Sequence, residues 1–136
     1  AITLGAECLC GGQPLDNQCY APTILLNPPA EATVSRQEIF GPVVCVYDYQ
    51  SLDEAIERAN SLDFSFQAAV FTDSLETALH CYQHLDAAAV MVNEHSAFRV
   101  DNMPFAGLKQ SGLGVGGIEH TINDMQIEKM LVLGLK

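Results

Sequence analysis

The sequence predicts an α/β fold built on a parallel βαβαβ unit. The chain has 136 residues, of which 49% are apolar and 17% charged, so it carries enough apolar side chain for a packed core. In its middle third, short apolar runs alternate with segments of helical periodicity. Strands that alternate with helices at this spacing are typical of a parallel sheet with right-handed crossovers.

The first strand and helix of this unit occupy residues 43–60. Residues 43–47 form a β-branched and aromatic run directly after Gly41-Pro42, which predicts a buried strand. Ser51 and Glu54 then have the spacing of a capping box. The apolar positions that follow recur at helical spacing and predict a helix: Leu52, Ala55, Ile56 and Ala59.

The pattern then repeats. Residues 68–71 predict a short buried strand, and we expect Asp73 to cap the next helix, with Glu76 three residues on. The apolar stripe of that helix is Leu75, Ala78, Leu79 and Tyr82. A third apolar run over residues 88–92 completes the unit.

The flanking segments are less regular. We expect strands at 7–10 and 23–26, a long Gly- and Pro-containing segment from 93 to 117, and a helix over 118–126. Lys129 and the four apolar residues after it, 130–133, predict a final strand that pairs with something outside this chain.

Charge and cysteine content restrict the function classes. The chain has 6 basic and 17 acidic residues, a net charge of −11, which argues against nucleic acid and anionic membranes as partners. Its five cysteines accompany no secretory signal, so we expect free thiols in a cytoplasmic protein. No apolar run reaches the length of a membrane span.

Two motifs favour structural roles. The Gly-rich run 107–117 lacks the Lys-Ser/Thr of a phosphate loop and follows no strand, so it is interpreted as a tight turn with positive φ angles. Cys8, Cys10, His80 and His84 include no CxxC pair and favour small core thiols and helix-surface histidines over zinc ligands. None of the cysteines has the surroundings of a nucleophile.

Three other residues leave functional alternatives open. Glu38 and Phe40 are two apart in a stretch expected to be extended, so they would share a side, as a ribose-binding carboxylate and an aromatic wall would. Such pairs are also common without function. Arg99, one of few basic residues, could clamp an anionic group or pair with Asp101 or Glu94.

Several motifs together resemble the aldehyde dehydrogenase superfamily. Gln37-Glu38-Ile39-Phe40-Gly41-Pro42-Val43 is similar to its Glu-Glu-Ile-Phe-Gly-Pro-Val signature. Residues 103–114 are similar to its Pro-Phe-Gly-Gly-x-Lys-x-Ser-Gly-x-Gly segment, with Ala106 at the position of one glycine. Upstream segments 5–12 and 20–23 resemble the family in the same order, so the resemblance covers essentially the whole chain.

The resemblance implies a three-layer α/β catalytic domain and the NAD- or NADP-dependent oxidation of an aldehyde through a cysteine thiohemiacetal. It implies cofactor binding by Glu38 and Phe40, and a place for Phe105 at the substrate entrance. Lys109 to Gly114 match a turn of mainly architectural role. Residues 93–99 resemble members that take small oxygenated or anionic aldehydes, which makes Arg99 a candidate contact for the substrate anion.

Important parts of that family are absent from these residues. Its nucleophile, in a Gly-Gln-x-Cys context, its general-base glutamate and its cofactor domain lie upstream of the Gly5 motif. We therefore expect a C-terminal piece, with residues 1–127 in the catalytic domain and 128–136 as an oligomerisation strand. The parent enzyme would be a homo-oligomer, a dimer or tetramer, acting on a small-molecule aldehyde, and this piece alone would be inactive.

Two alternatives remain. The chain could be a stand-alone assembly module that pairs residues 129–133 with a partner's sheet edge. It could also be a nucleotide-binding module that relies on Glu38 and Phe40 alone. In the fragment interpretation, an unpaired sheet edge and apolar helix faces are exposed and favour association.

Overall fold

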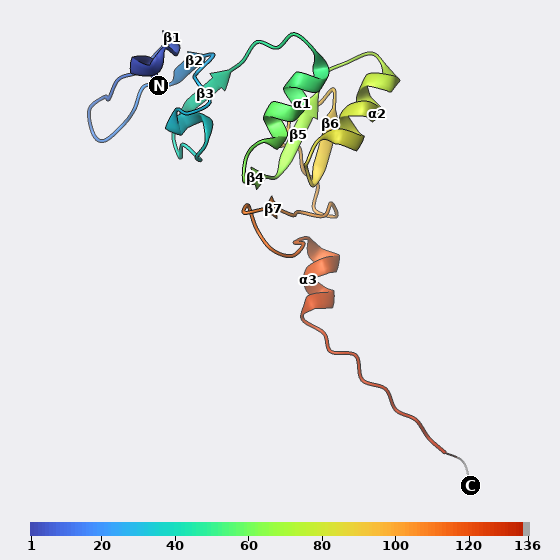
Figure 1. Cartoon of the computed structure of the whole chain (residues 1–136). Helices are drawn as coiled ribbons and strands as arrows, with labels where there is room; N and C mark the ends of the chain where they lie inside the picture. The colour runs from blue at the N-terminus through green and yellow to red at the C-terminus, as the bar shows by residue number, and fades with distance from the viewer. Residues whose placement is uncertain (135–136) are drawn as a thin grey trace. The chain divides into compact units, whose positions relative to one another are not determined.

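The structure is a computed structural model that describes residues 1–134. The chain divides into two compact units, Ala1–Glu54 and Ala55–Lys136. Each unit contains one pair of parallel strands, and the chain as a whole alternates strands with helices (Figure 1). The predicted α/β class is therefore confirmed.

The first unit is a mixed three-stranded sheet in the order β1-β2-β3. Strand β2 (Thr23–Leu26) lies between β1 (Glu7–Cys10), which is antiparallel to it, and β3 (Val43–Val46), which is parallel. The 3-10 helices η1 (Ile2–Leu4) and η2 (Thr33–Ser35) accompany the sheet. The apolar core of this unit is small: Ala6, Ala21, Leu25 and Ala32.

The single βαβαβ sheet expected from the sequence is not formed within the described residues. Strand β3 pairs with β2, whereas the two later strands of the expected unit pair with each other in a separate sheet. A strand has two edges that can accept a parallel neighbour, and the apolar pattern of residues 43–47 does not specify which edge is used. The predicted strands are present, but their pairing differs.

The second unit is organised around the parallel strands β5 (Gln67–Val70) and β6 (Ala89–Val92). The helices α1 (Leu52–Asn60) and α2 (Leu75–His84) flank this pair, and a short antiparallel pair, β4 (Phe64–Ser65) with β7 (Leu108–Lys109), lies beneath it (Figure 1). The buried core of this unit comes from both helices and β6: Ile56, Ala78, Cys81 and Met91.

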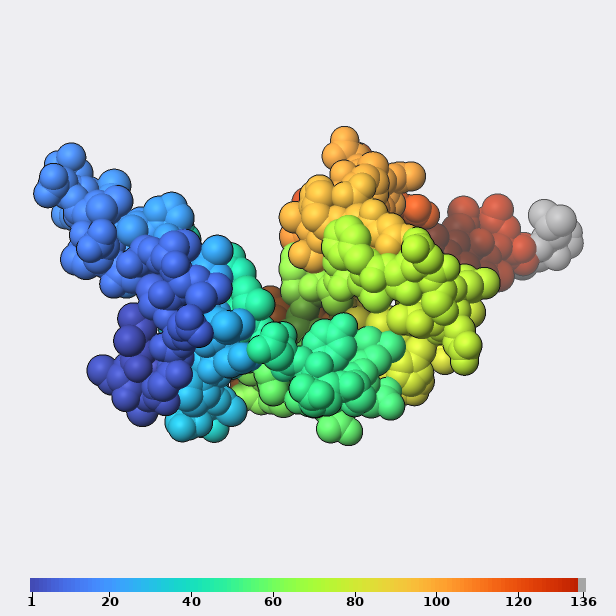
Figure 2. Space-filling model, turned by 90° about the horizontal axis from the view of Figure 1, so that it is seen from above, coloured from blue at the N-terminus to red at the C-terminus, as the bar shows by residue number. Residues whose placement is uncertain are grey.

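Helices α1 and α2 each follow a serine whose hydroxyl caps the first turn. The hydroxyl of Ser51 accepts a hydrogen bond from the N–H of Glu54 at 3.2 Å, as the capping-box pattern predicts. The Glu54 carboxylate reaches back to the N–H of Gln50 at 2.8 Å. The α1 and α2 helices lie next to each other on the surface of this unit (Figure 2).

The expected cap of α2 was wrong by one residue. Ser74, and not Asp73, is the N-cap, and its hydroxyl accepts from the N–H of Thr77 at 3.2 Å. The reason is a turn just upstream, in which the Thr72 hydroxyl accepts the N–H of Ser74 at 3.1 Å and delays the start of the helix.

The C-terminal part is less regular than predicted. Helix α3 spans Ile118–Asp124 and so ends two residues before the predicted position. The expected strand at 129–133 is not formed in the described part of the chain, where Ile127 is 95% and Leu133 75% exposed. A terminal strand needs a partner edge for its backbone groups. Within residues 1–134, no helix has the length and apolar content needed to cross a membrane.

Candidate functional site

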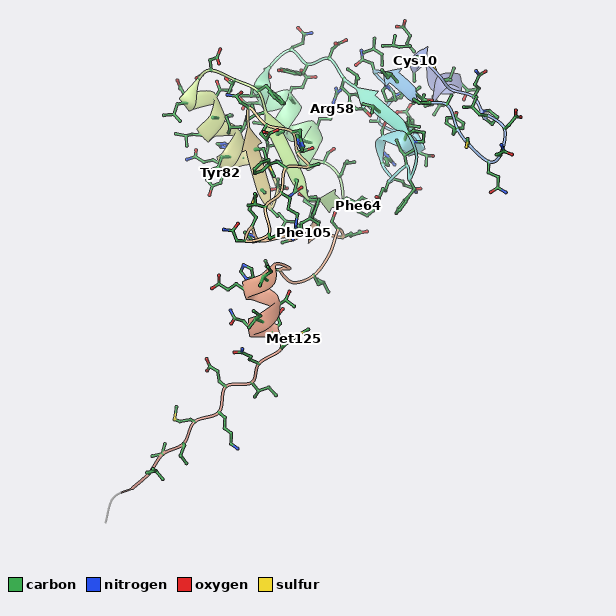
Figure 3. The ribbon with its side chains drawn as sticks, turned by 180° about the vertical axis from the view of Figure 1, so that it is seen from behind. Cys10, Arg58, Phe64, Tyr82, Phe105 and Met125 are labelled. Atoms are coloured by element: carbon green, nitrogen blue, oxygen red, sulfur yellow. The ribbon has the colours of Figure 1, made fainter. Side chains whose placement is uncertain are left out.

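The two predicted substrate-binding residues lie together in the second unit. The Cζ atom of Arg99 is 4.2 Å from the centroid of the Phe105 ring, which is a cation–π contact. The Phe105 ring also packs edge-to-face on Phe66, with centroids 4.7 Å apart and an interplanar angle of 81°. Figure 3 shows Phe105 at the end of the β5–β6 pair that faces α3. The guanidinium therefore lies over a ring that also contacts a second ring, that of Phe66.

The donors of Arg99 are not used by a neighbouring carboxylate. Glu94 accepts a hydrogen bond from the N–H of His95 at 2.9 Å and lies 3.6 Å from the ring nitrogen of that histidine. Among the described residues, no ion pair or hydrogen bond joins Arg99 to Asp101 or Glu94. Because a guanidinium has five N–H donors and no acceptor, Arg99 keeps its capacity to bind an anion.

Arg99 also lines an open pocket of about 590 Å³ beside α3. The other lining residues come from the segment after Arg99 and from the first turns of the helix: Asp101, Gly117, Ile118, Thr121 and Ile122. A cation on the wall of such a space can contact a small anionic molecule.

The loop that carries Phe105 is held closed by its own backbone. Phe105 and Gly116 exchange two hydrogen bonds, of 2.9 and 2.7 Å. A Cβ atom on Gly107 would lie 2.7 Å from the backbone of Ser111, so this position requires glycine. The hydroxyl of Ser111 accepts the N–H of Ser65 at 2.9 Å. Residues 105–116 thus form a tight loop, as the Gly-rich pattern predicts.

Lys109 ties this loop to the helices. Its Nζ atom donates to the carbonyl of Asn60 at 2.7 Å and of Leu62 at 3.1 Å, and it lies 2.9 Å from Oδ2 of Asp86. Its backbone φ of 53° lies in the left-handed region. These contacts join β7, the C-terminal end of α1 and the segment after α2, which is an architectural role of the kind the resemblance implies.

Sequence reasoning missed Asn60, the last residue of α1. Its amide donates to the carbonyl of His84 at 2.7 Å, and its Oδ1 accepts the N–H of Asp86 at 2.8 Å. The ends of α1 and α2 are therefore linked directly. An asparagine at the end of a predicted helix is a weak signal, because many such residues simply face solvent.

The two predicted cofactor residues lie in the first unit, and both are exposed. Phe40 is 90% exposed, and its φ of 49° turns the chain, so the stretch is not extended there as expected. The Glu38 carboxylate makes no hydrogen bond or ion pair with the part of the chain that the structure describes. The carbonyl of Pro42 accepts the N–H of Thr23 at 2.8 Å, which anchors the segment to β2.

The cysteines and histidines are arranged as separate groups. All five cysteines are free, and Cys10 and Cys19 are exposed. Cys81 is 2% exposed on α2, and burial raises the pKa of its thiol. The rings of His80 and His84 are 4.3 Å apart on the same helix. Residues 1–134 contain no group of three or more side chains that could hold a metal ion.

Comparisons with known proteins agree with the motifs. Residues 1–131 match the sequence model of the aldehyde dehydrogenase family. The chain is 39% identical over 135 residues to the 3-sulfolactaldehyde dehydrogenase of Priestia megaterium, an alignment that covers 99% of this chain and 28% of that protein. It is 36% identical to aspartate-semialdehyde dehydrogenase 1 of Pseudomonas canavaninivorans, with the same shares covered, 99% and 28%.

Solved structures give the same result. Aldehyde dehydrogenase 21 of Physcomitrella patens, in complex with its reaction product succinate, superposes with a TM-score of 0.87 at 34% identity over 92% of this chain and 26% of that one. An NADP complex of the glyceraldehyde-3-phosphate dehydrogenase of Methanocaldococcus jannaschii gives a TM-score of 0.82 at 34% identity, over 92% of this chain and 27% of that one. The chain spans little more than a quarter of each of these relatives, 28% in the first case. With a family match over residues 1–131 and a shared backbone, the chain belongs to the aldehyde dehydrogenase family.

Proposed function

We propose that this chain is the C-terminal part of an NAD(P)-dependent dehydrogenase that oxidises an anionic aldehyde to the carboxylic acid. Residues 1–127 would belong to the three-layer catalytic domain, and residues 128–136 would be its oligomerisation strand. The nucleophilic cysteine, the general-base glutamate and the cofactor domain would come from sequence outside these 136 residues. The small share of each relative that the chain covers, 28% of the first, supports this proposal.

The observation that carries the substrate class is the Arg99 guanidinium, which lies over Phe105 at 4.2 Å and is paired with no carboxylate among the described residues. A guanidinium in this state can donate two parallel hydrogen bonds to a carboxylate, sulfonate or phosphonate. The names of several relatives support the same class, since 3-sulfolactaldehyde, aspartate semialdehyde and sulfoacetaldehyde each carry an anionic group. Lactaldehyde, for which other relatives are named, is a neutral hydroxyaldehyde and provides the uncharged comparison substrate.

The substrate would be positioned by this pair of side chains. Phe105 would restrict the guanidinium to one plane and provide an apolar wall, and Arg99 would bind the anionic end of the aldehyde. Fixing that end orients the aldehyde carbon toward the reacting groups, and orientation of this kind accounts for a large part of enzymatic rate enhancement. In this assignment, Arg99 recognises the substrate and takes no part in proton transfer.

Glu38 and Phe40 have the chemistry that a nicotinamide cofactor requires. A carboxylate without a protein partner can accept hydrogen bonds from both hydroxyls of a ribose, and the ring of Phe40, 90% exposed, can cover the flat nicotinamide. When bound, NAD(P) accepts the hydride that the aldehyde carbon loses. We propose these roles for the two residues, in NAD- or NADP-dependent catalysis.

The fragment assignment is tested first by reading the gene upstream of the Ala1 codon. An open frame that encodes a Gly-Gln-x-Cys segment and a cofactor domain is expected. A start codon directly before Ala1 would overturn the assignment. The chain expressed alone should oxidise no aldehyde, even at saturating NAD(P).

The substrate class is tested with Arg99→Ala in the enzyme encoded by the complete reading frame. Loss of a charge-assisted contact should raise KM for an anionic semialdehyde by about 10- to 100-fold, with little change for a neutral aldehyde of similar size. Arg58→Ala is the matched control, because it removes the same charge from α1, away from Phe105 (Figure 3). Equal effects of Arg99→Ala on the two aldehydes would remove the anion-binding proposal.

A second candidate function is assembly. Residues 130–133 present four apolar side chains that the described chain does not cover, with Met130 86% and Leu131 80% exposed. We propose that this segment pairs with a second copy in a homo-oligomer. Light scattering should give a mass above that of the monomer, and deletion of residues 128–136 should lower it. A monomer at all concentrations would contradict the proposal.

The composition also bears on location and partners. The five free cysteines support a cytoplasmic location, and the net charge of −11 argues against nucleic acid as a partner.

A further inference from the structure

At the end of the β5–β6 pair, the side chain of Asn93 bonds to the backbone of Thr72. Asn93 follows β6 directly. Its Oδ1 accepts the N–H of Thr72 at 2.8 Å, and its Nδ2 donates to the carbonyl of the same residue at 2.9 Å. Its own N–H donates to the carbonyl of Val70, the last residue of β5, at 2.8 Å. The Asn93 side chain thus adds two hydrogen bonds to the chain after β5, just beyond the last backbone pairing of the two parallel strands.

The first unit contains the same arrangement at Asn27, directly after β2. The N–H of Asn27 donates to the carbonyl of Val46, the last residue of β3, at 2.8 Å, and its Oδ1 accepts the N–H of Asp48 at 2.9 Å. Its Nδ2 donates to the Asp48 carboxylate at 2.8 Å. Both asparagines have positive φ angles, 46° for Asn27 and 57° for Asn93. The two sites therefore share the backbone contact and the contact of Oδ1 with an N–H, and they differ in the acceptor for Nδ2, which is a carboxylate at Asn27 and a backbone carbonyl at Asn93.

The chain that follows differs between the two sites. Asn27 leads into Pro28-Pro29, whereas Asn93 leads into a short turn in which the N–H of Phe98 donates to the carbonyl of His95 at 3.0 Å. Arg99 is the next residue, and its guanidinium must reach the Phe105 ring at 4.2 Å. Only five residues, 94–98, separate the contacts of Asn93 from Arg99.

We infer that Asn93 is a positioning residue for Arg99, holding the start of the segment 94–99 against Thr72 so that the guanidinium meets Phe105. This inference rests on the proposed role of Arg99 in binding the substrate anion. Asn93 contacts neither substrate nor Arg99 in this assignment. It acts by restricting the exit of the chain from β6, and Asn27 does the same for a segment that carries no such arginine.

The duplicated arrangement provides a matched control. Asn93→Gly and Asn27→Gly each keep a residue that tolerates positive φ and remove only the side-chain amide. In the enzyme encoded by the complete reading frame, Asn93→Gly should raise KM for an anionic aldehyde about tenfold, with kcat and the KM for a neutral aldehyde nearly unchanged. Asn27→Gly should lower the Tm by about as much as Asn93→Gly does. It should leave the ratio of the KM for the anionic aldehyde to the KM for the neutral aldehyde as in the parent enzyme.

The outcomes separate this inference from the function on which it rests. If Arg99→Ala affects both aldehydes equally, the anion-binding proposal fails by itself. Arg99→Ala can raise the KM for the anionic aldehyde alone while Asn93→Gly does not, and then only the positioning role of Asn93 is overturned. The same holds if Asn27→Gly changes the ratio of the two KM values as much as Asn93→Gly does. Should Asn93→Gly give no folded enzyme, Asn93→Asp keeps the acceptor for the Thr72 N–H and loses the amide donor. It is expected to raise the same ratio, and an unchanged ratio overturns the inference.

Discussion

Lys109 and Asp86 form an ion pair, with Nζ 2.9 Å from Oδ2, that joins β7 to the segment after α2. The same ammonium group donates to the carbonyls of Asn60 and Leu62, at 2.7 and 3.1 Å. The last carbonyls of a helix have no partner within the helix, so a lysine at this position satisfies groups that would otherwise depend on water. Three segments of the second unit therefore meet at one nitrogen atom.

Replacing this lysine should destabilise the protein more than removing the ion pair alone. Lys109→Met keeps the length of the side chain but leaves both carbonyls without their donor, and should lower the free energy of unfolding by about 1–2 kcal/mol. Asp86→Asn removes only a half-exposed ion pair and should cost at most about 0.5 kcal/mol. Urea unfolding of the two variants checks this, and equal losses would show that the carbonyl contacts contribute nothing.

The cap of α2 can be tested with two adjacent residues. Ser74→Ala removes the hydroxyl that accepts the Thr77 N–H and should cost about 1 kcal/mol. Asp73→Ala, one residue earlier, removes no cap and should change stability by less than about 0.5 kcal/mol. A larger loss in Asp73→Ala, measured by urea unfolding, would restore the cap position that the sequence predicted.

The close approach inside the Phe105 loop makes a similar pair of predictions. Gly107→Ala places a Cβ atom 2.7 Å from the Ser111 backbone and should cost about 1–3 kcal/mol. Gly112→Ala is the control, since a Cβ atom there has no neighbour nearer than 3.8 Å. Thermal unfolding of both variants tests the packing of the loop. Equal Tm values for the two would contradict it.

Cys81 predicts a dependence of stability on alkaline pH. Burial raises the pKa of its thiol above the usual value of 9.0, so the unfolded chain releases this proton at a lower pH than the folded chain. The contribution to stability is therefore complete below pH 9.0 and is lost as the pH rises through the folded pKa. The parent should lose unfolding free energy over this range more steeply than Cys81→Ala. Parallel curves for the two proteins would exclude the effect.

Local patterns predicted most elements because each depends on a short stretch of chain. The strands at 7–10 and 23–26 were placed with the bounds that β1 and β2 have, and α1 begins at Leu52 after the Ser51 cap, as predicted. Sequence patterns did not predict a helix start that depends on a competing local hydrogen bond, nor a strand pairing that depends on an edge far away in the chain. The Thr72 turn shifted the start of α2, and β3 pairs with β2 because strand pairing is a property of two segments.

The candidate site shows the same division. The family motifs predict Arg99 and Phe105 as substrate contacts. Their cation–π contact depends on the loop that the hydrogen bonds between Phe105 and Gly116 close. Asn60 was a polar residue at the end of a predicted helix, and Asn93 belonged to a segment whose resemblance to the family indicated a role for Arg99 but none for Asn93 itself. Their contacts lie 24 and 21 residues away along the chain, at His84 and Thr72.

By itself the sequence determined the class of fold, the family motifs, the charge and the candidate residues for contacts with a nucleotide or an anion. These follow from side-chain chemistry and from hydrophobic periodicity, which act over a few residues. Only the tertiary structure decided which strands pair, that Arg99 keeps its donors free above Phe105, and that Lys109 reaches Asn60 across 49 residues. Such contacts depend on how the elements pack, because an edge or a guanidinium can accept several partners and the surrounding core selects one of them.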